Sequence, residues 1–68
     1  MRIKFITRDP RKGEAILLTD DEKEVARFSC YAHTDAGKKQ AIFHFEDVLL
    51  KRGMKADELK FKFTEVKE

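Results

Sequence analysis

The sequence predicts a β-rich α+β fold: an antiparallel sheet of four to five short strands, with one short helix at about residues 46–53 before the last strand. Three observations predict this class. Apolar and charged side chains alternate near both ends of the chain, which is the period of a strand with one buried face. Residues 9–13 and 34–39 contain the Asp and Gly residues typical of turns. The charged residues around 46–53 are arranged as a short helix requires.

Length and composition limit the class of protein. The 68 residues (1–68) form a single domain with a thin core, since a chain of this size buries only about 60% of its unfolded surface. The 15 basic and 13 acidic residues nearly balance, which excludes a histone-like polycation. Cys30 has no disulfide partner in the chain, no secretory signal follows the first Met, and no apolar run is long enough for a membrane helix. We expect a cytoplasmic protein that does not bind membranes.

Two strands and a turn are predicted at the start of the chain. Arg2–Arg8 alternates, with Ile3 and Phe5 on one face. The turn follows at residues 9–13, because Pro fixes φ and Gly accepts positive φ. The returning strand, Glu14–Thr19, has a continuous apolar centre, which predicts a central strand covered on both faces.

Residues 20–34 fit either a helix or a strand. The segment Thr19–Glu22 has the pattern of a helix capping box. Beyond Val25, however, apolar residues alternate with polar ones, and a helical stripe there would be weak. We predict an acidic turn followed by a strand over Val25–His33.

Residues 40–53 also allow two interpretations. One long helix would form a single stripe that consists of Ala41, Ile42, Phe45, Val48, Leu49 and Arg52. A strand followed by a short helix would instead place Phe43 and Phe45 on the same face of the strand.

Charge and glycine placement favour the short helix. In a long helix starting near residue 36, Lys38 would oppose the macrodipole and Gly37 would cost about 1 kcal/mol relative to Ala. A helix over 46–53 has acidic residues in its first turn, basic residues in its last and Gly53 at C′, with Met54 placed for a Schellman contact. The alternative is a ββ(α or β)αβ fold with a longer helix at about 36–52.

The last strand is predicted at Leu59–Val66, with Lys60 and Lys62 on an outer row that suits a sheet edge. One short helix leaves a face of the central strand uncovered. Either the sheet closes into a small SH3-like or OB-like barrel, or a homodimer or protein partner covers that face. The predicted core consists of Ile3, Phe5, Ile16, Leu18, Phe28, Phe43, Phe45, Val48, Leu49, Leu59, Phe61 and Phe63.

A cluster of cations is the predicted anion-binding site. If successive elements run antiparallel, the first and third loops lie at one end of the domain, and the acidic segment 20–24 lies at the other. The first end then carries a basic pole that consists of Arg8, Arg11, Lys12, Lys38 and Lys39. Such a cluster can contact phosphates. Solvated loop side chains explain the same residues more simply, because no aromatic platform accompanies them.

The sequence predicts no catalytic residues, no cofactor and no metal site. Cys30, His33 and His44 provide too few thiolates for a structural zinc site. Ser29, His33 and Asp35 have the residue types of a hydrolytic triad, but no nucleophile elbow surrounds the serine. No small-molecule substrate is implied.

We therefore expect a non-enzymatic binding or regulatory module, with two functions left open. The first is protein–protein interaction through the apolar sheet face or the outer strand edge, which needs no special net charge. The second is binding of nucleic acid or another polyanion through the basic pole, formed by loops 8–13 and 34–39.

Overall fold

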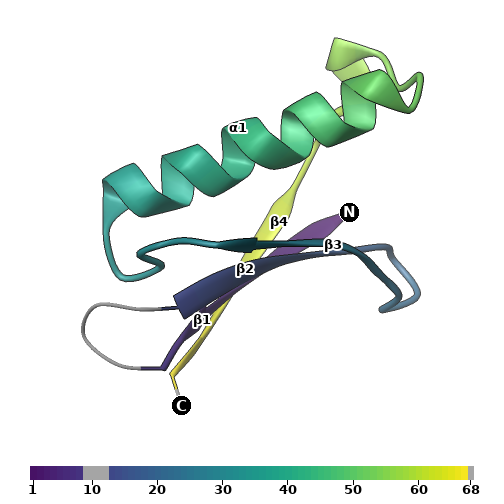
Figure 1. Cartoon of the computed structure of the whole chain (residues 1–68). Coiled ribbons are helices and arrows are strands. Elements are labelled where there is room, and N and C mark those ends of the chain that lie inside the picture. Colours follow the sequence, from purple (N-terminus) through teal and green to yellow (C-terminus); the bar gives the residue numbers. More distant parts are fainter. Residues whose placement is uncertain (9–12, 68) are drawn as a thin grey trace.

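The computed structural model describes residues 1–8 and 13–67, and its elements follow the order βββαβ (Figure 1). The strands are β1 (Arg2–Thr7), β2 (Gly13–Leu18), β3 (Glu24–Ser29) and β4 (Lys62–Lys67). One helix, α1 (Asp35–Lys51), follows β3, and a short 3₁₀ helix, η1 (Ala56–Glu58), precedes β4. The predicted α+β class is confirmed. The helix, however, matches the longer 36–52 alternative rather than the short helix at 46–53.

The four strands form one open, mixed sheet in the order β3–β2–β1–β4. β1 and β2 are antiparallel, as are β2 and β3, whereas β4 lies parallel to β1 with Arg2 opposite Lys62. The prediction of a purely antiparallel sheet is therefore corrected for the last strand. The physical reason is that α1 carries the chain back across the sheet before β4 begins (Figure 1). β3 and β4 remain edge strands, so the sheet is not a closed SH3-like or OB-like barrel.

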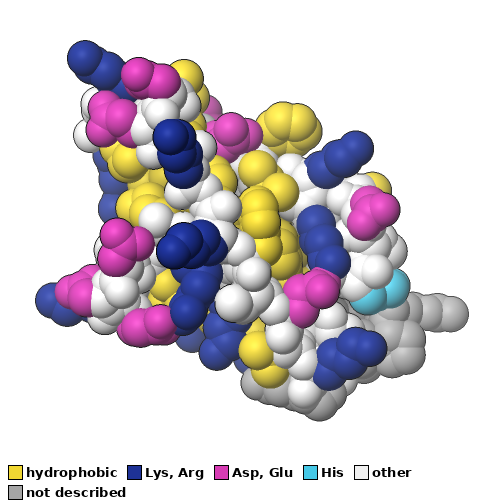
Figure 2. Space-filling view, turned by 180° about the vertical axis from the view of Figure 1, so that it is seen from behind, with side chains coloured by type: hydrophobic (Ala, Val, Ile, Leu, Met, Phe, Trp, Pro, Cys, Tyr) yellow, Lys and Arg dark blue, Asp and Glu magenta, His cyan; other side chains and the backbone are white. Residues whose placement is uncertain are grey.

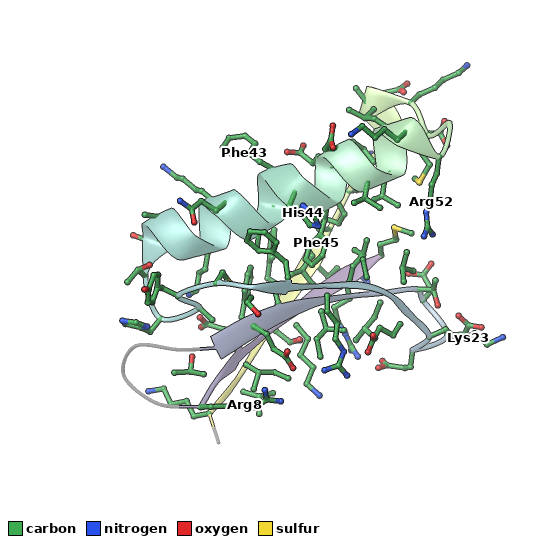
Figure 3. The ribbon with its side chains drawn as sticks, in the orientation of Figure 1. Arg8, Lys23, Phe43, His44, Phe45 and Arg52 are labelled. Atoms are coloured by element: carbon green, nitrogen blue, oxygen red, sulfur yellow. The ribbon has the colours of Figure 1, made fainter. Side chains whose placement is uncertain are left out.

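The hydrophobic core lies between α1 and one face of the sheet. Ala41, Phe45 and Leu49, each four residues apart on the helix, are at most 2% exposed. They pack against the strands and the loop before the helix, through Ile3, Phe5, Ala15, Leu17 and Ala32. Phe43 was predicted in the core, but it is 68% exposed and points away from the sheet (Figure 3). In a helix, residues two positions apart lie on nearly opposite sides, so Phe43 and Phe45 cannot both face the sheet.

The outer face of the sheet carries a second, smaller apolar cluster made of Ile6, Ile16 and Leu18, with Val66 packed against it. The first three side chains are at most 9% exposed. By register, Ile16 lies between Lys4 of β1 and Arg27 of β3, and long charged side chains cover apolar surface with their methylene stems. β2 is therefore buried on both faces, as predicted, without closure into a barrel and without a second chain.

Both ends of α1 have local hydrogen bonds that satisfy its terminal backbone groups. The Thr34 hydroxyl is the N-cap and accepts a hydrogen bond from a first-turn backbone N–H at 3.0 Å. At the other end Gly53 has φ of 96°, and its N–H donates to the Leu50 carbonyl at 3.0 Å. The Met54 N–H donates to the Leu49 carbonyl at 3.1 Å. The predicted Schellman end at Gly53 and Met54 is confirmed.

The predicted strand before residue 46 is wrong, because α1 already begins at Asp35. Two tertiary contacts remove the objections to a long helix. Gly37 is buried, and an added Cβ atom there would lie 2.1 Å from the Tyr31 carbonyl oxygen. Lys38, which opposes the macrodipole, forms an ion pair with Glu65 of β4. Gly37 is required where the helix meets the preceding loop. Glu65 of β4 provides the negative charge that balances Lys38 in the first turn of the helix.

The remaining strand boundaries need smaller corrections. The segment after the acidic turn is a strand, as predicted, but β3 ends at Ser29 rather than at His33. The last strand begins at Lys62 rather than Leu59. Phe63 was predicted in the core and is 53% exposed, because the helix does not cover β4 as it covers β2 and β3.

Candidate functional site

A groove between α1 and β4 is the candidate functional site. α1 packs mainly against β2 and β3, which leaves the helix-facing side of β4 uncovered. The groove has a volume of about 350 Å³ and is lined by Phe5, Lys38, Ile42, Phe63 and Glu65. Figure 2 shows the molecule from behind, where hydrophobic side chains form a band across the middle of the face, bordered by charged ones. The groove combines an exposed aromatic ring with an edge strand, which makes it the candidate binding surface.

Aromatic rings form the floor of the groove. The Phe63 ring stacks on the buried Phe5 ring, with centroids 6.1 Å apart and planes inclined by 14°. The Lys38 ammonium lies 5.7 Å from the centroid of the Phe5 ring, within the range of a cation–π contact. The same ammonium pairs with Glu65, so that a salt bridge joins the helix to the strand across one part of the groove. The groove therefore has an apolar floor and a charged bridge.

The backbone of β4 provides a second element of the site. β4 is an edge strand, and the Lys62 N–H donates to the Met1 carbonyl at 3.0 Å, toward β1. Backbone groups of successive residues in a strand point to opposite sides. The N–H and C=O groups of Phe63, Glu65 and Lys67 therefore point to the free edge. These are the same residues whose side chains lie on the helix-facing side of β4, since they pair with helix-facing residues of β1.

The free edge is basic. Among residues 1–8 and 13–67, no ion pair involves Lys60, Lys62 or Lys67, and all three side chains are exposed. The acidic residue of β4, Glu65, is already paired with Lys38. The prediction of a lysine-bearing edge strand is therefore confirmed, with β4 starting three residues later than expected.

The described residues of the basic pole, Arg8, Lys38 and Lys39, lie on two sides of the sheet. Arg11 and Lys12 lie outside the described residues. The Arg8 guanidinium donates to Glu14 at 3.0 Å and lies on the side of the sheet away from α1 (Figure 3). Lys38 and Lys39 lie in the first turn of the helix on the other side, where Lys38 is engaged by Glu65 and Lys39 is exposed. Binding of a polyanion by these five residues stays a prediction.

The other polar residues considered from the sequence are not brought together. His44 stacks on Phe28 with centroids 4.6 Å apart, and His33 makes an edge contact with Tyr31. Burial, and then the negative charge of Glu14, raise the pKa of the Cys30 thiol above its ordinary value. Within the described residues, no cluster of three His, Cys, Asp or Glu side chains could hold a metal ion, and no helix is long and apolar enough to cross a membrane.

Comparison with known proteins gives no match that would indicate a function. No family model matches the sequence, and neither the curated proteins nor the solved structures give a significant match. The site is therefore argued from its own geometry.

Sequence reasoning missed the groove because it placed Phe63 in the core. The alternation of Phe61 and Phe63 with lysines indicated a strand, but the observed strand begins at Lys62, and its helix-facing side carries Phe63 together with Glu65 and Lys67. It could not show that the helix would cover β2 and β3 and leave that face of β4 open. One signal was present: the last strand has the highest density of lysines next to aromatic residues in the chain.

Proposed function

We propose that the protein is a small binding module that takes up a segment of another polypeptide in extended conformation along β4. The bound segment adds a strand to the sheet edge and places an apolar side chain in the groove beside Phe63. The observation that carries this proposal is that Phe63, a residue of the edge strand β4, has a half-exposed ring. Strand addition gains affinity from backbone hydrogen bonds and specificity from alternate side chains.

The dimensions of the groove support a peptide side chain rather than a small-molecule ligand. A volume of about 350 Å³ is at the lower end of the range for ligand pockets, roughly 300–1,000 Å³. The groove is open to solvent and is lined by two residues of β4, Phe63 and Glu65. Three residues of β4 present outward backbone groups, which supports a short antiparallel ladder.

The test begins with selection of peptides from a random library displayed on phage, using the immobilised protein. Selected peptides are synthesised and titrated into ¹⁵N-labelled protein, with amide shifts followed by NMR. We expect the largest shifts at Phe63, Glu65 and Lys67. Phe63→Ala is expected to weaken binding at least tenfold, since central aromatic residues dominate such interfaces.

Phe43→Ala is the matched control, because Phe43 is also a largely exposed phenylalanine, at 68% against 53% for Phe63, and lies on the outer side of α1. We expect this variant to bind selected peptides within twofold of the wild type. Thermal unfolding of both variants checks their fold, since loss of the Phe5–Phe63 stack removes about 0.5–1.5 kcal/mol. The proposal is contradicted if no peptide is enriched, or if the enriched peptides shift amides elsewhere and are lost with Phe43→Ala alone.

A further inference from the structure

We infer that the segment bound along β4 is acidic, with two carboxylates placed in a defined register around one large apolar residue; this inference rests on the proposed function. The free edge carries Lys60, Lys62 and Lys67, none of them in an ion pair with a described residue, whereas its acidic residue, Glu65, is held by Lys38. A partner strand with carboxylates supplies the charge that this edge lacks.

The alternation of β4 defines which positions of the partner meet which charges. Lys62 lies on the outer face of the sheet, and Phe63 and Lys67 lie on the groove face, by their register with β1. An antiparallel partner places one residue directly opposite each of these three. Its apolar residue is then opposite Phe63, and its carboxylates are opposite Lys67 and Lys62.

Read in the partner's own direction, this register gives a short pattern. An acidic residue opposite Lys67 comes first, a large apolar residue opposite Phe63 follows four positions later, and a second acidic residue opposite Lys62 comes directly after it. The first acidic residue and the apolar residue share the groove face, whereas the second acidic residue points to the outer face. The pattern is therefore acidic-x-x-x-apolar-acidic.

A second copy of this chain fits the edge poorly. Two β4 edges brought together would each contribute Lys60, Lys62 and Lys67, with Glu65 of each copy already engaged by Lys38. Like charges placed opposite one another destabilise strand pairing, and edge lysines are a common protection against self-association. The positive charge of the β4 edge therefore favours a partner other than a second copy of this chain.

The experiment uses synthetic ten-residue peptides of Ser and Thr that differ only in the placement of one Leu and in the two charged residues. The matching peptide carries Glu, Leu and Glu in the predicted register, a second peptide replaces both Glu by Lys, and a third shifts Leu by one position. A one-residue shift moves the apolar side chain to the other face of the strand. Each peptide is titrated into the full ¹⁵N-labelled chain, with affinity taken from the amide shifts of β4.

We expect the matching peptide to bind about threefold to thirtyfold more tightly than either of the others. In the double variant Lys62→Glu/Lys67→Glu, the preference between the Glu and Lys peptides is expected to reverse. The double variant Lys39→Glu/Lys55→Glu makes the same change in net charge at exposed positions away from β4, and it is expected to keep the wild-type preference.

The possible failures are distinguishable. If the Glu and Lys peptides bind equally and both shift the β4 amides, the acidic register is wrong and strand addition survives. If no peptide of any charge shifts these amides, the proposed function itself fails. A doubled mass without peptide, with shifts confined to β4, would identify a second copy as the occupant. A single-stranded oligonucleotide that shifts the same amides more strongly than the Glu peptide would also overturn the inference.

Discussion

At the first turn of α1, Gly37 is buried against the backbone of the preceding loop. An added Cβ atom would lie 2.1 Å from the Tyr31 carbonyl oxygen and 2.9 Å from the Thr34 hydroxyl oxygen. The Thr34 hydroxyl also caps the helix by accepting from the Gly37 N–H. The same glycine therefore allows the close approach of the loop and provides the donor that fixes the helix start.

This contact predicts an unusual result for Gly37→Ala. In an open helix, replacing Gly by Ala stabilises by about 1 kcal/mol. Here we expect a loss of about 1–3 kcal/mol, because the methyl group meets backbone atoms that cannot rotate away. Urea unfolding followed by circular dichroism measures the change. Gln40→Ala, at an exposed position of the same helix, is expected to change stability by less than about 0.5 kcal/mol. A stabilised Gly37→Ala variant would contradict the close packing.

Among the elements, α1 gives a direct comparison between two phenylalanines that are two residues apart. Phe45 is fully buried in the core, and Phe43 is mostly exposed on the far side of the helix. We expect Phe45→Ala to lose about 3–5 kcal/mol, which is enough to unfold much of a domain of this size. Phe43→Ala is expected to stay within about 0.5 kcal/mol of the wild type. Equal losses in the two variants would instead support the strand in which both rings share one face.

The end of α1 could be predicted from sequence, but its beginning could not. Gly53 and Met54 form the Schellman end through bonds to residues within one turn, so the signal is local. The start depends on Lys38, whose partner Glu65 is 27 residues away. Local rules count that lysine against the helix, because they cannot include a strand that pairs with it later. Asp47 and Lys51, taken as opposite ends of a short helix, in fact form an ion pair at 3.0 Å within a long one.

The candidate site was less predictable than the fold. The strand pattern identified which residues of β4 alternate, and the lysines indicated an edge. Whether Phe63 is covered depends on which strands the helix crosses, and this depends on packing between small residues such as Ala15, Ala41 and Gly37. The position of α1 over the sheet is set only when the helix and the sheet pack together. No segment of the chain carries it alone.

For the whole molecule, burial of the outer sheet face bears on oligomeric state. Either closure into a barrel or a second chain was expected to cover the second face of the central strand, yet Ile6, Ile16 and Leu18 are 5%, 7% and 9% exposed within one chain. We therefore expect light scattering at high micromolar concentration to give the mass of one 8.0 kDa chain. A mass twice as large would show that another surface associates. The amide shifts of β4 in the titrations described above would then decide whether that surface is β4.

The parallel pairing of β1 and β4 joins the two ends of the sequence, and this has a consequence for the order of folding. Arg2 pairs with Lys62, sixty residues later, whereas Thr7 pairs with Gly13, six residues later. Closing the longer loop costs more chain entropy, and long-range strand pairs form slowly for that reason. β1, β2 and β3 can pair first. α1 then packs onto these three strands, and β4 pairs with β1 last. Until that final step, the edge of β1 is open, and β4 is itself an unbound extended segment. β4, the strand that we propose binds peptides, is therefore itself added to an open sheet edge as an extended segment.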